Sequence, residues 1–287
     1  MRLDEAATAR VVHAALDHGI NFFDTADAYS RGLSEQYLGA ALKGRRDQAV
    51  ILTKFGSPAD PDHPDHRGAS ATHVRRAVEN SLRRLDTDHI DVYMQHQPDP
   101  NTPIEETLEA LDRLVKEGKV RTIACSNFAG WQLADADWTS RTRGFARFVA
   151  AENHWNLSER SVEREVIPAA RRFGLSVIPF FPLASGLLTG KYRRGQPPPE
   201  GTRLAGFPRS DRFLNDRNYS LAEAVERFAR ERGTSMTAVA LGWLAAQPDV
   251  CSVIAGATSP EQVAANVEAV TWTPGEEDLA ELDKVLS

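Results

Sequence analysis

NFFDTADAYSRGLSEQYLGAAL, residues 21–42, begins as an apolar run, turns polar at Asp24 and then resumes, after a short loop, with apolar residues at helical spacing. A short apolar run followed by a longer periodic segment is typical of a strand and then a helix. The predicted strand therefore ends in an aspartate, and Tyr29 lies in the loop beyond it. Both positions need an explanation other than core packing.

The same strand-then-helix unit repeats along the chain. Predicted strands cover 21–24, 49–54, 90–96, 120–125, 148–152, 176–180 and 251–255, and predicted helices cover 34–43, 71–85, 104–117, 131–135, 161–173 and 260–269. Residues 1–19 also have a helical period, and Gly118 and Gly174 lie where helices are expected to stop.

Alternating units with continuously apolar strands predict a parallel sheet that is buried on both faces. A chain of 287 residues with no GxGxxG after its first strand favours a closed (β/α)8 barrel of the TIM type over an open doubly wound sheet. We therefore expect one α/β barrel domain spanning 1–287, although the pattern shows seven strands and not eight.

The composition is ordinary, with 41% hydrophobic and 26% charged residues and a formal net charge of −6. Interleaved acids and bases argue against nucleic-acid and membrane partners. The N-terminus lacks a secretory pattern and no apolar run is long enough for a membrane span, so we expect a cytoplasmic protein. Cys125 and Cys251 fall in predicted strands, where we expect reduced core thiols.

Two segments rich in proline, glycine and charge, 56–70 and 193–216, are predicted loops that follow strand ends. The first contains His63 and His66, which leave a metal site as a minor alternative. Four tryptophans are expected to pack in the core, and Trp155 is expected either to pack or to line a substrate cleft. The four are Trp131, Trp138, Trp243 and Trp272.

In a parallel barrel all strand ends point to one face, so polar residues that terminate apolar strands meet there. Asp24, Lys54 and His96 end three successive predicted strands, and Tyr29 can fold back over the same mouth. A lysine ammonium at about 4 Å is worth about 4 kcal/mol at an effective dielectric near 20, which would lower the pKa of a tyrosine. We therefore expect Tyr29 to donate a proton to a carbonyl, Asp24 to keep Lys54 charged, and a neutral His96 to orient the oxygen.

Seven stretches carry a family resemblance. They are NFFDTADAYSRGLSEQYLGAAL, VILTKFG, HIDVYMQHQPDP, IACSNF, ENHWNLSER, PLASGLLTGKY and VIAGATSPEQVAANV. In order and spacing they resemble the aldo-keto reductase superfamily across essentially the whole chain, and most of all the bacterial general aldo/keto reductases, which are related to potassium-channel β subunits. The resemblance implies an NADPH-dependent barrel enzyme that reduces aldehydes or ketones, with the four residues above in the roles given.

The resemblance also implies a dinucleotide site. Ser126, Asn127 and Glu152 would hold the nicotinamide carboxamide, and Phe180 would stack on the ring. The further positions implied at the pyrophosphate, the phosphates and the adenosine end are Phe181, Pro182, Leu183, Ser185, Gly186, Lys191, Arg203, Gly256, Thr258, Gln262 and Asn266. No metal is expected in this site.

The sequence departs from the family pattern at two positions and in where it begins. Glu152 stands where a glutamine is usual, and Ala265 stands where relatives often carry a glutamate for the adenine amine, which leaves NADP against NAD open. Relatives begin with a hairpin and a first barrel strand, and Met1 falls after both, so we expect a barrel without that strand. Either the true start codon lies upstream of Met1 or the truncation is real.

Two other classes of function are compatible with these features. One is a protein that holds NADPH as a redox sensor with little turnover, and the other is a metal-dependent barrel hydrolase. The full set of four site residues favours the reductase. The sequence names neither a physiological substrate nor an oligomeric state.

Overall fold

The computed structural model describes residues 3–58, 67–208 and 210–286. Its centre is a six-stranded sheet with the order β1-β2-β3-β4-β5-β6, in which every neighbouring pair is parallel. The strands are β1 (Phe22–Asp24), β2 (Val50–Phe55), β3 (Ile90–Gln95), β4 (Val120–Ser126), β5 (Phe148–His154) and β6 (Ser176–Phe180). The first six predicted strands are therefore confirmed, each to within two residues at either end.

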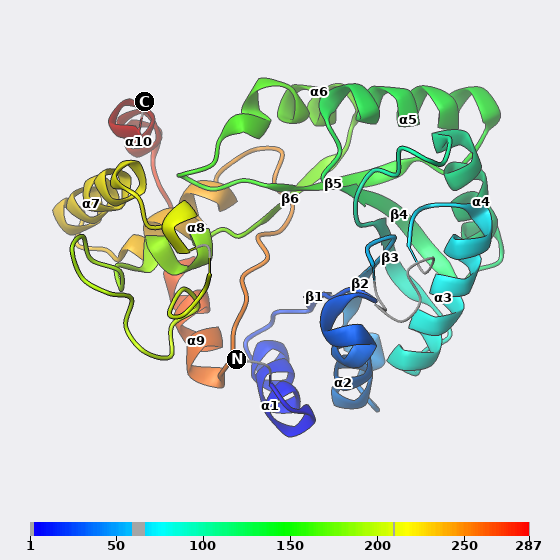
Figure 1. Ribbon diagram of the computed structural model, residues 1–287, viewed down its shortest axis with the longest axis horizontal. Helices are drawn as coiled ribbons and strands as arrows, with labels where there is room; N and C mark the ends of the chain where they lie inside the picture. The colour runs from blue at the N-terminus through cyan, green and yellow to red at the C-terminus, as the bar shows by residue number, and fades with distance from the viewer. Residues whose placement is uncertain (1–2, 59–66, 209, 287) are drawn as a thin grey trace.

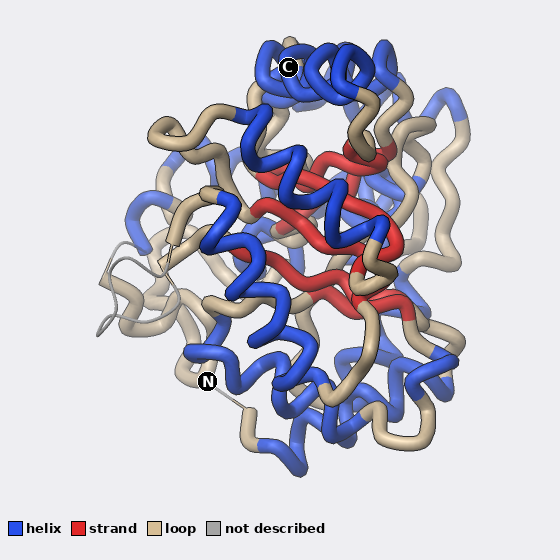
Figure 2. Tube along the Cα trace, turned by 90° about the vertical axis from the view of Figure 1, so that its right-hand side faces the viewer, coloured by secondary structure: helices blue, strands red, loops and turns tan. Residues whose placement is uncertain are grey.

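Ten α-helices lie in the described part of the chain. They are α1 (Glu5–Asp17), α2 (Leu33–Ala41), α3 (Ala71–Leu85), α4 (Ile104–Lys116), α5 (Gly130–Arg143), α6 (Val166–Phe173), α7 (Asp216–Glu231), α8 (Met236–Ala245), α9 (Pro260–Ala269) and α10 (Glu276–Leu286). Figures 1 and 2 show the helices lying outside the strands, with the curved sheet between α3–α6 and the C-terminal third of the chain. None of these helices is long and apolar enough to span a bilayer.

The helices form where the sequence supplies both an apolar stripe and end signals. In α3 the buried residues recur at three- and four-residue spacing, and the Ser70 hydroxyl accepts a hydrogen bond from His73 N at 3.3 Å to cap the first turn. Gly174 ends α6 in the left-handed region, and Gly118, also left-handed, follows the last turn of α4. These stops are confirmed.

The expected closed barrel is only partly seen. Residues 251–255, predicted as a seventh strand, form no ladder, because the only bridge there joins Val250 to Val177, and Cys251 N donates to Val177 O at 3.2 Å. The described residues thus form a curved six-stranded parallel sheet of the kind found in a half-barrel. Cys251 is correspondingly exposed, which corrects its expected place in the core, whereas Cys125 is buried and free.

Two of the four tryptophans expected in the core are on the surface. Trp131 is 64% exposed and Trp138 is 72% exposed, because both lie on the outer face of α5, seven residues apart, while Leu133 and Ala136 face inward. Trp243 is buried, and Trp272 is half-buried against the core. Trp155 is 2% exposed and packs edge-to-face on Trp243, so it belongs to the core.

Successive strand residues point to opposite faces, which places two layers on the concave side of the sheet. The lower layer is apolar and consists of Leu52, Met94, Ala124, Ala150 and Ile178. Two residues further along each chain segment come Lys54, His96, Ser126, Glu152 and Phe180. The apolar layer therefore lies beneath a second, mostly polar layer at the carboxyl end of the sheet, where the candidate site lies.

Candidate functional site

The structure brings the four residues expected to act together into one group. Lys54 donates a short hydrogen bond to Asp24 Oδ2, and its ammonium lies 5.3 Å from the centre of the Tyr29 ring. The Tyr29 and His96 rings meet edge-to-face with centroids 5.7 Å apart. We call these four residues, together with Glu152, the carboxyl-end cluster.

Backbone pairing beyond β1 fixes the loop that carries Tyr29. Thr25 N donates to Leu52 O at 2.9 Å and Asp27 N donates to Lys54 O at 3.1 Å, so the chain follows β2 past the end of the strand. A tight turn comes next, with Ser30 at φ 52° and Arg31 at φ 58°. Left-handed backbone at two such residues is strained, and this kind of strain commonly marks functional segments.

The cluster sets the protonation of its own members. Burial lowers the pKa of Lys54, but the carboxylates of Asp24 and Glu152 outweigh burial and raise that pKa above its usual value. Burial and the Lys54 charge together lower the pKa of His96 to about 4. A charged lysine and a neutral histidine therefore face Tyr29 at neutral pH, as expected from the sequence.

The expected pKa of Tyr29 is corrected. Burial raises the pKa of Tyr29 above its usual value, and the carboxylates of Asp24 and Glu152 raise it further, although the Lys54 ammonium lowers it. The pKa expected from the sequence took account of Lys54 but not of the burial of Tyr29 or of the Glu152 carboxylate. Tyr29 is thus a neutral phenol over the whole physiological range.

Glu152 completes the cluster from β5. Its side chain is 4% exposed, and its Oε2 lies 3.3 Å from Lys54 Nζ without forming a hydrogen bond. Burial, followed by the neighbouring Asp24 carboxylate, raises the pKa of Glu152 to about 8. Ser126 is the register partner of Glu152 on β4, and Asn127 N donates to Glu152 O at 2.9 Å.

Asn127 ties two strand ends together. Its side-chain amide donates to His96 O at 2.9 Å and to Ser126 Oγ at 3.0 Å, and its φ of 63° is one that asparagine tolerates better than most residues. These contacts place Ser126, Asn127 and Glu152 next to one another, as the resemblance implied.

An aromatic group stands at the end of β6. Phe180 is stacked on the imidazole of His154 with centroids 5.3 Å apart and planes 9° apart, because the two residues are register partners on β5 and β6. Phe181 meets both rings edge-to-face, and the Arg203 guanidinium lies 4.8 Å from the Phe181 ring centre. The sequence reading missed His154, which strand alternation two residues after Glu152 could have revealed.

A tight turn follows Phe181 and contains the positions expected beside a pyrophosphate. Phe181, Ala184 and Ser185 have positive φ values of 55°, 46° and 58°. Gly186 has φ 94°, and a Cβ there would lie 2.5 Å from Lys191 Cε, so only glycine lets the lysine pack across the turn. Pro182 and Leu183 lie in the same turn, and the Lys191 side chain packs against it at Gly186.

The four positions expected at the adenosine end lie around the start of α9. Thr258 N donates to Gln262 Oε1 at 2.8 Å, and the Ser259 hydroxyl accepts from Gln262 N at 3.4 Å to cap the helix. Asn266 is one turn beyond Gln262 on the same helix, and the backbone before Thr258 includes Gly256, beside which no atom lies within 4 Å of a Cβ position. These residues form a second group, in which Gly256, Thr258 and Gln262 are exposed and Asn266 is half-buried.

A buried acidic group behind the cluster was not anticipated. Asp27 is 4% exposed, and burial, reinforced by the charge of Glu35, raises its pKa to about 7. Glu35 accepts hydrogen bonds from Thr53 Oγ1 and Arg84 Nε, both at 2.6 Å. Asp27 lies between Asp24 and Tyr29 in sequence, and only this position could have indicated that it belongs near the site.

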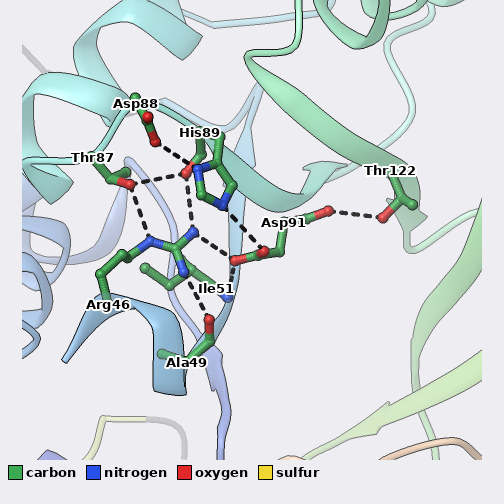
Figure 3. Close-up of polar contacts among 8 residues, drawn as sticks. All are labelled: Arg46, Ala49, Ile51, Thr87, Asp88, His89, Asp91 and Thr122. Atoms are coloured by element: carbon green, nitrogen blue, oxygen red, sulfur yellow. Dashed lines mark hydrogen bonds and ion pairs between the residues drawn. The ribbon is translucent and has the colours of Figure 1, made fainter.

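A different polar group lies at the amino ends of β2 and β3 (Figure 3). Arg46 donates to Asp91 Oδ2 at 2.6 Å, to Ala49 O at 2.7 Å, to Thr87 Oγ1 at 3.0 Å and to His89 O at 3.1 Å. Asp91 Oδ2 also accepts from Ile51 N at 2.8 Å. We call Arg46, Thr87, His89 and Asp91 the amino-end network; it borders a surface cavity of about 440 Å³.

Among the described residues, no three histidine, cysteine, aspartate or glutamate side chains are grouped as metal ligands. His63 and His66, the candidates raised from the sequence, lie outside the described residues. A second cavity, of about 230 Å³, is bordered by residues that include Trp155, Arg160 and Trp243. Neither cavity includes a residue of the carboxyl-end cluster.

Comparison with known proteins assigns the chain to a family. The model of the Aldo/keto reductase family matches residues 1–287. An uncharacterized oxidoreductase of Bacillus subtilis, YrpG, is 39% identical over 98% of this chain and 87% of its own length, and the aldo-keto reductase YhdN of the same organism is 35% identical over 99% and 84%.

A probable voltage-gated potassium channel subunit beta of Arabidopsis thaliana is 33% identical over 95% of this chain and 84% of its own length. The relatives therefore include proteins named as oxidoreductases and proteins named as channel subunits, and the former support a general oxidoreductase role. With a family model that covers the whole length, this chain belongs to the aldo/keto reductase family.

Proposed function

We propose that the protein is an NADP(H)-dependent reductase that converts aldehydes or ketones to alcohols, with Tyr29 as the general acid. The observation that carries the proposal is the meeting of Tyr29, charged Lys54 and neutral His96 at one end of the sheet. Three such groups around one phenol suit proton donation to a carbonyl oxygen. Family membership supports the same chemistry.

The residues present fit a nicotinamide dinucleotide. Glu152 Oε2 and His96 Nδ1 are buried without a hydrogen-bond partner, so the cluster retains polar atoms for a ligand and a substrate. Phe180 would stack on the nicotinamide, and Ser126 and Asn127 would hold its carboxamide. Lys191 and Arg203 would meet the phosphates, with Thr258, Gln262 and Asn266 at the adenosine end. When bound, the dinucleotide supplies the hydride.

In this proposal the chain's own residues handle the proton. Tyr29 donates its hydroxyl proton to the carbonyl oxygen as that oxygen becomes an alcohol. Lys54 stabilises the phenolate that forms, and Asp24 keeps Lys54 charged and oriented. His96, being neutral, hydrogen-bonds the carbonyl oxygen without competing for the proton. A preference for NADP(H) and a cytoplasmic location are part of the same proposal.

The test is the rate of NADPH oxidation by the purified chain with a panel of small aldehydes and ketones. Replacing Tyr29 with phenylalanine is expected to lower turnover by about 10²- to 10⁴-fold, the range for a lost general acid. Tyr37→Phe, a change of the same kind on α2, is the matched control and is expected to keep full turnover. Equal turnover in the wild type and Tyr29→Phe would overturn the assignment.

A redox sensor that retains NADPH is the second candidate, and the channel-subunit relatives are the observation that favours it. The two candidates differ in release of the oxidised cofactor. A sensor binds NADPH tightly and completes about one turnover, so a single burst with every carbonyl in the panel would favour it. Continued turnover would favour the reductase.

A further inference from the structure

The carboxyl-end cluster contains more buried negative charge than its one cation can neutralise. The Lys54 side chain is fully buried, and two carboxyl groups, those of Asp24 and Glu152, approach its ammonium. If both were ionised, the group would carry a net negative charge in a site where the Glu152 side chain is only 4% exposed. Uncompensated buried charge is strongly unfavourable, and neighbouring carboxyl groups avoid it when one of them keeps its proton.

The geometry indicates which carboxyl holds the proton. Asp24 accepts the direct hydrogen bond from Lys54 and its side chain is 14% exposed, so its charge is satisfied and partly solvated. Glu152 lies 3.3 Å from the same ammonium, and its Oε2 accepts no hydrogen bond. An ionised oxygen in that position would be buried beside a cation that already bonds Asp24 and would have no well-aligned hydrogen bond, whereas a protonated carboxyl can donate to the neighbouring Asp24.

The other groups near Glu152 do not change this balance. Tyr29 is a neutral phenol, and burial raises the pKa of the Cys125 thiol well above its usual value, so that thiol is also neutral. The nearest charged groups are therefore Lys54 and Asp24, and together they cancel.

We propose that Glu152 carries a proton in the resting site and that its ionisation adds a negative charge beside Lys54, which makes Tyr29 a weaker acid. A protonated carboxyl offers one donor and one acceptor, the same complement as the glutamine that the resemblance leads us to expect there. Glu152 is thus a positioning residue that acts through Lys54 and Tyr29. Its effect on carbonyl reduction rests on the proposed function, but its protonation state does not.

The first test needs no cofactor. Carboxyl-carbon NMR on the chain labelled at glutamate, with Glu152→Gln to assign the resonance, follows the titration of Glu152 directly. We expect a midpoint near pH 8, the value to which burial and Asp24 raise the pKa of this group. A midpoint near the ordinary glutamate value of about 4.3 would overturn the proposal.

The second test follows Tyr29 by tyrosine ring-carbon NMR, with Tyr29→Phe to assign it. In the wild type Glu152 is ionised before Tyr29 titrates, so Glu152→Gln is expected to lower the pKa of Tyr29 by about one unit, the size of one removed charge at a partly buried site. An unchanged or higher pKa would contradict the link between the two residues.

Turnover separates this inference from the proposed function. If the protein is a reductase, the wild type should lose rate from pH 7 to pH 9, by at most about tenfold, because a group with a midpoint near 8 is only about a tenth protonated at pH 9 and Tyr29 is the weaker acid in the ionised form. Glu152→Gln should keep its rate over the same interval. A rate that falls equally in both would sink the role of Glu152, whereas no turnover in either would count against the reductase and leave the NMR results standing.

Discussion

Strands β2 and β3 carry a charged group at each end, and the two groups are built differently. At the amino end Arg46 has four hydrogen bonds to atoms of the chain, and the Asp91 carboxylate that it meets also accepts from a backbone amide. At the carboxyl end Lys54 faces two carboxyl groups, and His96 and Glu152 keep buried atoms without partners. The first group satisfies itself, whereas the second has capacity left for a ligand.

The completeness of the hydrogen bonding distinguishes an ion pair that stabilises the fold from one that serves a site. Stability favours a charge whose hydrogen bonds are complete, because each unsatisfied buried atom costs free energy. A site that must hold a substrate leaves some of them incomplete and accepts that cost. We therefore expect changes at the carboxyl end to reduce activity and changes at the amino end to reduce stability.

The largest expected effect is on turnover and comes from Lys54→Met. Without the ammonium, Tyr29 loses the group that stabilises its phenolate, so NADPH oxidation should fall by about 10²- to 10⁴-fold. Steady-state rates with the best carbonyl of the panel measure it. Full activity in Lys54→Met would erase the distinction between the two ends.

The next effect is on stability and comes from Arg46→Met. Removing four hydrogen bonds and leaving Asp91 without its cation should cost about 2–4 kcal/mol of unfolding free energy, with the rate of the folded protein unchanged. Urea unfolding followed by circular dichroism, beside the rate at 25 °C, gives both quantities. A variant as stable as the wild type would show that the amino-end network contributes little.

A smaller effect depends on pH. The pKa of His96 is about 4 in the folded chain, against about 6.5 when unfolded, so between these values the unfolded chain binds a proton that the folded chain does not. Stability from this source is therefore lost as the pH falls from about 6.5 towards 4, and does not change above that window. The drop in urea midpoint from pH 7 to pH 5 should shrink in His96→Gln; an equal drop in both would contradict the buried, neutral state.

The smallest effect is expected from His89→Gln at the edge of the amino-end network. His89 Nδ1 pairs with Asp88 at 2.6 Å and its Nε2 lies 3.7 Å from Asp91, but Asp88 is 93% exposed. Exposed pairs contribute little, so the unfolding free energy should change by less than about 1 kcal/mol and turnover not at all. A larger loss would mean that the network depends on His89 as well as on Arg46.

Much of the site was predictable because it depends on strand ends. Asp24, Lys54 and His96 close three apolar strands, and the parallel arrangement brings such ends together. The pKa of Tyr29 was not predictable, since it depends on burial and on Glu152, which lies 123 residues further along the chain. The sequence does not show that two residues so far apart along the chain lie close together in the fold.

The errors in the fold have similar causes. The segment 251–255 is apolar enough for a strand, but among the described residues its only backbone hydrogen bond to β6 is the one from Cys251 N to Val177 O, and a strand exists only where a neighbour completes its ladder. Helices α7, α8 and α10 were not predicted, and for α8 the reason is that it is buried on nearly all sides and shows no amphipathic period. The surface positions of Trp131 and Trp138 follow from the register of α5, which residue type alone does not reveal.

We expect that the carboxyl-end cluster is maintained for function at a cost in stability. The urea unfolding midpoint of the triple variant Asp24→Asn, Lys54→Met, Glu152→Gln tests it most directly, because the change removes every charge of the cluster together and keeps side-chain size. We expect a midpoint equal to or above that of the wild type, since replacing a buried charged group with uncharged residues of similar size often leaves stability unchanged or raises it. A fall as large as that of Arg46→Met would contradict it and make the cluster a structural network like the one at the opposite end.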